Sequence, residues 1–488
     1  MTIAEWLGRL LQAGLGNLAA YLAAHVLLCL VPAFYIAGAM TALIPKESVT
    51  RFLGRNAPTW IAYPAAALAG SVLAVCSCTI VPLFAGIYKK GAGIGPAVTF
   101  LFFAPAGNIL ALVYTGGIIG ADLAFARLAL SLVFGIGIGM IMALIFQRAE
   151  ARREQAGEDP FAAKGGMRRP AVAFLIVLVV LLLAGTFKVG LFTNTYAEVR
   201  LPISGADRFQ GLLSSLVPYD ASRGEEGVTT QGAVLIGLLV LVGLTSWKGF
   251  ERIHEGFTSW TWLALGLTAL TLLTAAAGMS PHTGGVDVRF TGRFFGVLLA
   301  LGGLAWLIFR RLSEDERRDW LWESWRFVKQ IFPLLGVGVF AVGVIRELMR
   351  PEWIRVLAGT NSLLGNLAGV LFGVFMYFPT LVEVPIANMF LGLGMHRGPL
   401  LAYLMADPEL SLQSILMISV VIGRLKAWTY VGWVAVFSAA AGLIYGSWVD
   451  GAGIGLTTVY LSSFLAVLAA ALWWANRRRL LVSQPQVP

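Results

Sequence analysis

Two cysteines separated by one serine carry the most distinctive chemistry in this sequence. Cys76 and Cys78 precede Pro82 within residues 56–88, a stretch that contains no charged side chain. Thiolates favour soft metals and metalloids as ligands, although isolated buried cysteines more often act as small hydrophobic residues. On an intact helix the two thiols would point about 200° apart, so both reach one ligand only if the helix unwinds near Pro82.

A second pair of soft donors lies earlier in the chain. His25 and Cys29 are four residues apart, on one face of the first long apolar segment. If that face pointed inward, the pair would complete a soft-metal site. Packing is the commoner role for such a pair, because cysteine behaves as a small hydrophobic residue.

Glu383 is the one carboxylate between residues 356 and 396. An ionisable residue inside a membrane helix is a functional candidate by default, and carboxylates often relay protons. We therefore predict that Glu383 couples proton movement to transport. The alternative is a carboxylate at the membrane edge that pairs with a basic residue.

Other polar side chains near these segments are candidates for the substrate path. Asn108 and Asn388 would bind substrate from the two halves of the chain. The basic residues nearby are Arg127, Arg424 and Lys426. They are either partners for Glu383 or Asp407, or anchors at the membrane interface, and anchoring is the favoured role.

The prolines around these residues follow a repeated pattern. Pro82, Pro96 and Pro105 recur 303 residues later as Pro385, Pro399 and Pro408. The same offset separates five further pairs: Gly70 and Gly373, Gly95 and Gly398, Ile119 and Ile422, Gly120 and Gly423, and Phe134 and Phe437. Proline interrupts a helix because it lacks an N–H and clashes with the carbonyl four residues back. Transporters commonly place the substrate where such broken helices of two repeats meet, so Pro82 and Pro385 are predicted to lie there.

The elements that position these residues must span a membrane. Of the 488 residues, 58% are apolar and 13% charged, and the mean hydropathy is +0.78. A soluble protein of this length needs more polar residues on its surface. A spanning helix takes about 20 apolar residues, and about thirteen segments of the sequence qualify. We therefore predict an all-α polytopic membrane protein whose two homologous halves contain broken helices.

The net charge of +10 does not indicate a nucleic-acid partner. The basic residues cluster beside apolar segments, where Lys and Arg orient membrane proteins. Three cysteines are too few for a disulfide framework. Motifs for nucleotide hydrolysis, zinc proteases and serine hydrolases are absent from the sequence, and no cofactor is expected.

Four regions are predicted along the chain. They are a first transmembrane repeat of about four helices at 1–147, charged linkers with four inserted transmembrane helices at 148–329, a second transmembrane repeat at 330–447, and a C-terminal helix with a basic tail at 448–488. Within the linkers we predict a loop at 147–169 and a short surface helix at 208–216. The charged, Trp-rich stretch 310–329 is predicted to be a helix that lies at the membrane interface.

Two groups of motifs resemble the ArsP-type permeases. The first group is Cys76-Ser-Cys-Thr-Ile-Val-Pro82 and Gly95-Pro-Ala-Val-Thr-Phe-Leu-Phe-Phe-Ala-Pro-Ala-Gly-Asn108. The second is Pro379-Thr-Leu-Val-Glu-Val-Pro385, Gly394-Met-His-Arg-Gly398 and Asp407-Pro-Glu-Leu-Ser-Leu412. The resemblance implies membrane efflux, with trivalent organoarsenicals as the family's best-known substrates. Under it, Cys76 and Cys78 match the family's cysteine motif and Glu383 matches its second-repeat acid, while residues 148–329 are longer than the family leads us to expect.

We therefore expect a secondary-active efflux permease of the cell (inner) membrane. Its substrates would be soft, thiol-reactive small molecules, above all trivalent arsenicals, exported in exchange for protons. Membrane lipid is the other expected partner, and an oligomer is compatible with the sequence. The alternatives are a transporter of another metal or a small anion, and a non-transporting membrane subunit or enzyme.

Overall fold

The computed structural model forms two compact units, each assembled from separate segments of the chain. The described residues are 3–24, 26–54, 57–72, 77–156, 168–186, 190–202, 205–217, 227–282, 285–348, 351–375, 383–451 and 453–482. Unit 1 comprises Met1–Ser48, Ala74–Lys90 and Gly165–Leu348, and unit 2 comprises Val49–Leu73, Gly91–Lys164 and Met349–Pro488. The chain therefore passes repeatedly from one unit to the other.

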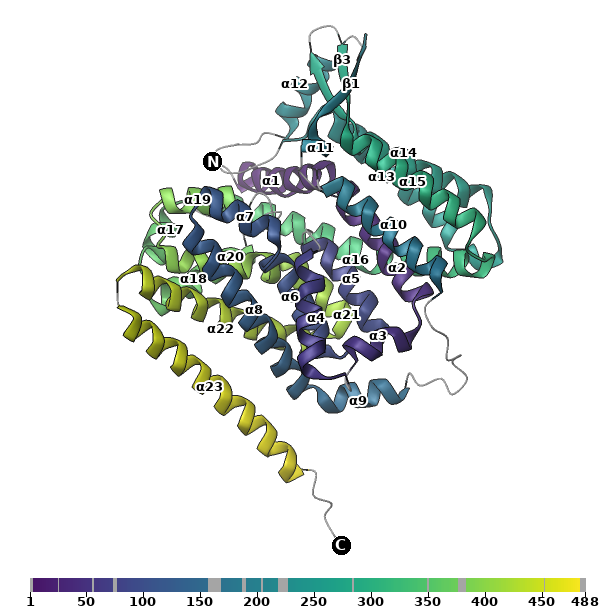
Figure 1. Ribbon diagram of the computed structural model, residues 1–488. Helices are drawn as coiled ribbons and strands as arrows, with labels where there is room; N and C mark the ends of the chain where they lie inside the picture. Colours follow the sequence, from purple (N-terminus) through teal and green to yellow (C-terminus); the bar gives the residue numbers. More distant parts are fainter. Residues whose placement is uncertain are drawn as a thin grey trace. The chain divides into compact units, whose positions relative to one another are not determined.

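Unit 1 is built mainly from apolar helices. Its helical elements are α1 (Ile3–Ala24), the π-helical turn η1 (Val26–Leu30), α2 (Val31–Leu43), α5 (Ser77–Lys89), α10 (Arg169–Thr186), α11 (Gly190–Thr193), α12 (Ala206–Leu216), α13 (Thr230–Phe250), the 3-10 turn η3 (Ile253–Glu255), α14 (Ser259–Ala276), α15 (Gly292–Arg310) and α16 (Glu314–Leu348). Helix α3 (Lys46–Leu53) lies where the chain leaves unit 1. Helix α14 packs against both α13 and α15, and the three helices are drawn in teal and green in Figure 1.

Helices α2 and α16 pack closely because a glycine and a serine face each other. A Cβ atom on Gly38 would lie 2.0 Å from Ser324 Oγ, so only glycine allows this approach. Trp320 donates from its indole N–H to the carbonyl of Tyr35, at 2.9 Å. Trp320 and Trp325 are both buried. The helix expected over 310–329 is found from Glu314 onward as the first turns of the long helix α16, and its place at the membrane interface stays a prediction.

A small antiparallel sheet, which the sequence analysis did not predict, accompanies the helices of unit 1. The strands β1 (Thr195–Leu201), β2 (Gly278–His282) and β3 (Gly285–Thr291) pair in the order β1-β3-β2. Four buried apolar residues hold the sheet against the surface helix α12: Ala206, Ala277, Val286 and Val288. The predicted short helix at 208–216 is confirmed as α12. Strands this short give a weak sequence signal between long apolar helices.

Unit 2 contains the remaining helices. They are α4 (Thr59–Val72), α6 (Ile94–Ala106), α7 (Ile109–Ile118), α8 (Ala121–Ile145), α9 (Gln147–Ala156), α17 (Pro351–Ala358), α18 (Leu363–Phe375), α19 (Glu383–Gly392), α20 (Arg397–Leu410), α21 (Leu412–Ile422), α22 (Arg424–Val449) and α23 (Gly453–Val482). The predicted loop at 147–169 is wrong at its start, because α9 continues the chain as a helix to Ala156. Figure 1 shows α23 in yellow beside α22, on which it packs.

The helix bounds in unit 2 recur at the sequence offset. Adding 303 to the first residues of α6, α7 and α8 gives the first residues of α20, α21 and α22. Gly120 and Gly423, each directly before α8 or α22, both have positive φ values, of 149° and 87°. Positive φ favours glycine, because a Cβ atom is strained there.

Fewer helices of the described residues meet the length and composition of a membrane span than the roughly thirteen segments predicted for the whole chain. Among the described residues, seven helices are long and apolar enough to cross a membrane, or up to nine if each of two bent pairs counts as one span. Several predicted spans are short helices instead, such as Leu363–Phe375 and Thr79–Lys89. The fold class is confirmed: this is an all-α polytopic membrane protein with broken helices, accompanied by one small sheet.

Candidate functional site

A buried ion pair links α8 to α19 within unit 2. The Nη2 atom of Arg127 lies 2.6 Å from Oε1 of Glu383, and both side chains have 0% exposure. Taking two charges out of water is costly, and their attraction repays the cost only with further hydrogen bonds. Arg127 makes these bonds: Nε donates to the carbonyl of Ala106 at 2.9 Å, and Nη1 donates to Thr115 Oγ1 at 3.3 Å.

The break between α6 and α7 creates the acceptor that Arg127 uses. Pro105 lies near the end of α6, and Asn108 starts α7 by accepting a hydrogen bond from Ala111 N at 2.7 Å. Carbonyls in the last turn of a helix lack an intrahelical partner, and the Ala106 carbonyl receives Arg127 instead. One guanidinium therefore ties the end of α6, the middle of α7 and the start of α19 to α8.

A second buried carboxylate lies at the corresponding break in the second half. Glu409 is in the last turn of α20, just before the 46° bend to α21. Tyr430 on α22 donates from its hydroxyl to Glu409 Oε2 at 2.5 Å, and both residues are buried. Oε1 of Glu409 is buried without a hydrogen-bond partner among the described residues. No basic side chain of the described residues bonds to this carboxylate.

The predicted site residues of unit 2 do not all meet. Glu383 is buried, whereas Pro385 and Asn388, further along α19, are exposed. Asn108 is buried and acts as the cap of α7. The favoured role of Arg127 as a membrane-interface anchor is wrong, because the structure buries it against Glu383.

The cysteine motif belongs to unit 1. Cys76 and His25 lie outside the described residues, and for Cys78 the structure describes only the backbone, in the first turn of α5. Thr79, the next residue, lies with its Oγ1 atom 2.6 Å from Cys29 Sγ. Pro82 is buried in α5, which packs on α2. Cys29 thus lies beside the start of the motif helix, on the π-helical turn η1. Among the described residues, no group of three or more His, Cys, Asp or Glu side chains is arranged to hold a metal ion.

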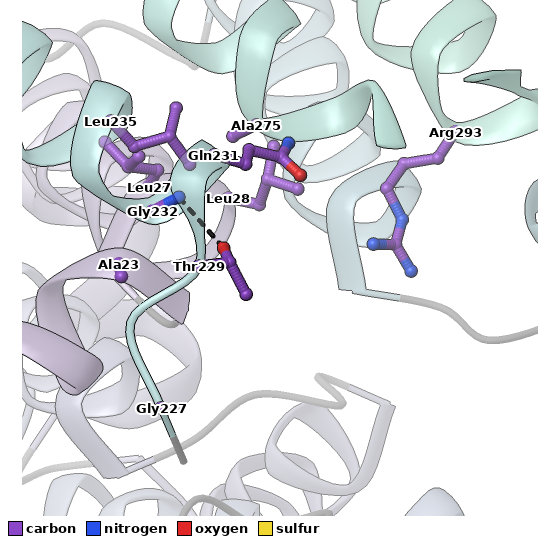
Figure 2. A pocket seen from close by; sticks show the side chains of 10 residues that line it. All are labelled: Ala23, Leu27, Leu28, Gly227, Thr229, Gln231, Gly232, Leu235, Ala275 and Arg293. Atoms are coloured by element: carbon purple, nitrogen blue, oxygen red, sulfur yellow. Dashed lines mark hydrogen bonds between the residues drawn. The ribbon is translucent and has the colours of Figure 1, made fainter. Parts of the chain in front are cut away.

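A cavity of about 420 Å³ lies elsewhere in unit 1 (Figure 2). It is lined by Ala23, Leu27, Leu28, Gly227, Thr229, Gln231, Gly232, Leu235, Ala275 and Arg293. Gln231 is held in place by bonds from its amide to the carbonyls of Thr274 and Ala277, at 2.8 and 2.5 Å. Arg293 Nε is buried with no hydrogen-bond partner among the described residues. The cavity therefore combines apolar side chains with the polar side chains of Thr229 and Gln231 and one cation, Arg293. The predicted cysteines and carboxylates do not line it.

Sequence reasoning missed two residues of the buried polar groups. The sequence motifs give Glu409 no role beyond its place in the Asp407 motif and give Tyr430 none. The offset of 303 residues carries a usable signal, because Tyr430 lies 303 residues after Arg127 and Glu409 lies 303 residues after Ala106. Applying the offset to every polar residue would have pointed to both.

Long apolar helices that bury a few charged groups define a multi-pass membrane protein. The chain belongs to the ArsP family of permeases: a family model described as "Predicted permease" matches residues 12–447. The chain is also similar to a UPF0718 protein of Methanocaldococcus jannaschii, with 32% identity over 448 residues, which are 91% of this chain and 98% of the relative. No solved structure matches the chain. The family makes the protein a transporter of the membrane.

Proposed function

We propose that this permease exports soft, thiol-reactive small molecules, above all trivalent arsenicals, across the inner membrane in exchange for protons. The observation that carries the proposal is the buried ion pair of Arg127 and Glu383 at a helix break. Ionisable groups are expensive inside membrane helices, and they mark ion and substrate pathways. A passive membrane subunit would have no use for such a pair. An enzyme would need catalytic polar residues gathered at one interface of the membrane.

Substrate binding is assigned to Cys76 and Cys78. Both belong to the motif that resembles the ArsP-type permeases, and thiolates bind soft metalloids. Support comes from Cys29, whose Sγ atom contacts Thr79 next to the motif. Cys29 lies on a π-helical turn, a local geometry that is frequent at functional sites. His25, four residues before Cys29, would be a further donor.

The path between the cysteines and the outside is assigned to the residues at the helix breaks. Pro82, Asn108, Pro385 and Asn388 would line it. Pro385 and Asn388 have exposed side chains on α19, as lining residues require. Asn108 would act through the break that it caps.

Glu383 is assigned to proton coupling. A proton on Glu383 removes the charge that balances Arg127, so protonation and the ion pair exclude each other. The pair is therefore a two-state element, and a proton gradient shifts the population of the two states. Release of Arg127 would free the end of α6 and the start of α19 to move.

The cysteine assignment is tested by arsenical resistance in a metalloid-sensitive host. We expect the double variant Cys76→Ser/Cys78→Ser to lose resistance to trivalent methylated arsenicals, because serine is a hard oxygen donor. The membrane level of the variant, measured by immunoblot, controls for folding. Resistance equal to wild type at an equal membrane level would reject the assignment.

The coupling assignment is tested in inverted membrane vesicles with an imposed pH gradient. Glu383→Gln keeps the size of the side chain but removes its titration, so gradient-driven accumulation should stop while substrate exchange at equilibrium continues. Gradient-driven rates equal to wild type would exclude Glu383 from coupling.

The cavity in unit 1 favours a second candidate function, transport of a small organic anion. Its volume of about 420 Å³ suits a small organic ligand, and Arg293 supplies a cation with an unused donor. In the same vesicles, Arg293→Gln would then reduce anion uptake, while Cys76→Ser/Cys78→Ser would not. If arsenical uptake falls in Cys76→Ser/Cys78→Ser and is unchanged in Arg293→Gln, the result supports the arsenical proposal.

A further inference from the structure

Three carboxylates of unit 2 are at most 2% exposed among the described residues: Glu383, Asp407 and Glu409. Glu383 and Glu409 differ in what balances their charge. Glu383 has the guanidinium of Arg127 at 2.6 Å. Glu409 has only the phenol of Tyr430, and its second oxygen is buried without a hydrogen-bond partner among the described residues. Both carboxylates lie beside helix breaks, Glu383 at the start of α19 and Glu409 at the end of α20.

An ionised carboxylate without a counter-charge is far more costly to bury than a neutral carboxylic acid. A phenol donates one hydrogen bond but no positive charge, so Tyr430 compensates only a small part of that cost. The neutral acid leaves one polar atom unpaired, which is a much smaller penalty. In this conformation Glu409 is therefore stable as the acid, whereas Glu383 is stable as the anion.

The helices packed against α20 offer Glu409 no other charge partner. These helices are α6, α8, α18, α19, α21 and α22. Their titratable side chains are Asp122, Arg127, Glu383, Arg424, Lys426, Tyr430 and Tyr445, and α20 itself carries Arg397, Tyr403, Asp407 and Glu409. Asp122 is held by Arg397 and Tyr445, Lys426 by Glu150, and Arg127 by Glu383. Arg424 is exposed at the start of α22.

We propose that Glu409 is a second proton-binding site, which carries the proton in this conformation and exchanges it with water when the α20–α21 bend opens. The inference rests on the proposed function, in which a proton moves against the substrate. On one side, hydronium gives a proton to the Glu409 carboxylate: one O–H bond of hydronium breaks, the O–H bond of the acid forms and water is left. On the other side, the O–H bond of the acid breaks and the proton passes to water, which becomes hydronium. Tyr430 is a positioning residue that holds Oε2 of Glu409.

Infrared difference spectroscopy of the purified full-length protein tests the protonation directly. A protonated carboxylic acid has a C=O stretch that is separate from the carboxylate bands and shifts in D₂O. We expect this band in wild type near neutral pH, with a component that is lost in Glu409→Gln and retained in Asp407→Asn and in Glu383→Gln. Asp407 is the other buried acid of α20, so Asp407→Asn separates its contribution from that of Glu409. Glu251→Gln, which removes an exposed carboxylate outside the helices, is the surface control and should leave the band unchanged. A band of unchanged intensity in Glu409→Gln, or one whose Glu409 component disappears in Glu383→Gln, would overturn the proposal.

Transport in inverted vesicles tests whether this proton is the one exchanged. Glu409→Gln should abolish accumulation driven by the pH gradient and retain equilibrium exchange. Normal gradient-driven accumulation in Glu409→Gln would overturn the exchange role. If wild-type vesicles show no gradient-driven arsenical uptake while the band still depends on Glu409, the proposed substrate fails and the proton site stands.

Two further variants keep the test decisive if Glu409→Gln does not fold. Glu409→Asp retains an acid, so the band should remain but change its frequency. Tyr430→Phe removes the hydrogen bond to Oε2, so the band should shift to the frequency of a less strongly bonded acid. A band that is unaffected by both variants would assign the proton to another residue.

Discussion

Arg127 and Tyr430 lie 303 residues apart and hold corresponding helix ends. Arg127 on α8 donates to the backbone carbonyl of Ala106, at the end of α6. Tyr430 on α22 donates to the side chain of Glu409, which lies 303 residues after Ala106. The first half therefore uses a backbone acceptor where the second half uses a carboxylate. If the halves are copies, as the sequence predicts, a structural bond in one has a titratable counterpart in the other.

Breaking the buried ion pair should be more harmful than removing it. Arg127→Gln leaves Glu383 buried without its counter-charge, and we expect a loss of about 3–5 kcal/mol in the free energy of unfolding. The double variant Arg127→Gln/Glu383→Gln leaves no unpaired charge and should recover much of that loss. Thermal unfolding of the purified variants in one detergent measures both. A double variant less stable than Arg127→Gln would contradict this account.

The sequence could identify Glu383 and offer Arg127, Arg424 and Lys426 as possible partners, but it could not select Arg127 among them. A single carboxylate in a long uncharged stretch is visible by inspection, and it was predicted. Arg127 lies 256 residues away in the chain, and a lone arginine near the end of an apolar segment is usually an anchor. Only the packing of α8 against the broken helices distinguishes a buried partner from an anchor.

At the scale of elements, glycines set the distance between the helices of unit 2. A Cβ atom on Gly139 would lie 2.6 Å from the carbonyl oxygen of Gly95, and one on Gly442 would lie 2.6 Å from that of Gly398. Gly442 lies 303 residues after Gly139, and Gly398 lies 303 residues after Gly95. The crossings of α6 with α8 and of α20 with α22 are therefore made in the same way.

Gly442→Ala should separate α20 from α22. Its new methyl group would also overlap Asn366 Oδ1, at 1.9 Å, and we expect a loss of about 1–3 kcal/mol in stability. Gly432→Ala on the same helix is the matched control, because nothing lies within 4 Å of its Cβ position. Replacing this exposed glycine should leave stability unchanged or raise it by up to about 1 kcal/mol. Equal effects of the two variants, measured by thermal unfolding, would refute the close crossing.

The contact between the α13–α14 connection and α16 should depend on pH. Lys329 and Trp325 donate hydrogen bonds to Glu251 and hold the pKa of its carboxyl below the ordinary value of 4.5. A lowered pKa stabilises the fold above that ordinary value, and the contribution disappears as the pH falls through the lower folded value. Glu251→Gln should therefore be slightly less stable than wild type at pH 7, by about 1 kcal/mol or less for an exposed pair. In unfolding measurements the difference should shrink as the pH falls below 4.5 and vanish once the pH is below the lowered pKa of the folded state. A difference that does not shrink as the pH falls would exclude the ion pair as its cause.

Most helices of the fold could be predicted from apolar length, and the helix breaks could be predicted from proline and glycine. Gly95-Pro96 and Gly398-Pro399 do lie in the first turns of α6 and α20. The strands could not be predicted, because their pattern is short and their pairing joins β1 to β3 across three helices. Nor could the length of α16 be predicted, since its charged first turns resemble a surface segment until their tryptophans are seen to be buried.

At the scale of the whole molecule, neither unit is a continuous piece of sequence. Unit 1 takes Ala74–Lys90 from between two segments of unit 2, and unit 2 is completed only by Met349–Pro488. The regions predicted from the repeat, 1–147 and 330–447, describe a proposed duplication and remain a prediction. The compact units follow from contacts in the folded protein, whereas the predicted repeats follow from similarity within the sequence. The boundaries of the two divisions therefore need not coincide.

Cutting the chain within the charged linker should test this arrangement. A fragment of residues 1–164 contains parts of both units and all of neither, and the same holds for residues 165–488. We expect each fragment alone to be degraded, and the two fragments produced together to form a complex that purifies through a tag on one of them. Stable accumulation of the first fragment alone would contradict the interleaved units.

The packing of α1 on α16 has a consequence for how the protein is made. Asn17 donates to the carbonyl of Val339 at 2.7 Å, and Gly343 meets the backbone of Ala13. A ribosome that adds 5–20 residues per second needs roughly 15–60 s to travel between these positions. For that interval α1 is already synthesised, whereas Val339 and Gly343 are not. The contacts between α1 and α16 can therefore form only after the middle of the protein has been translated.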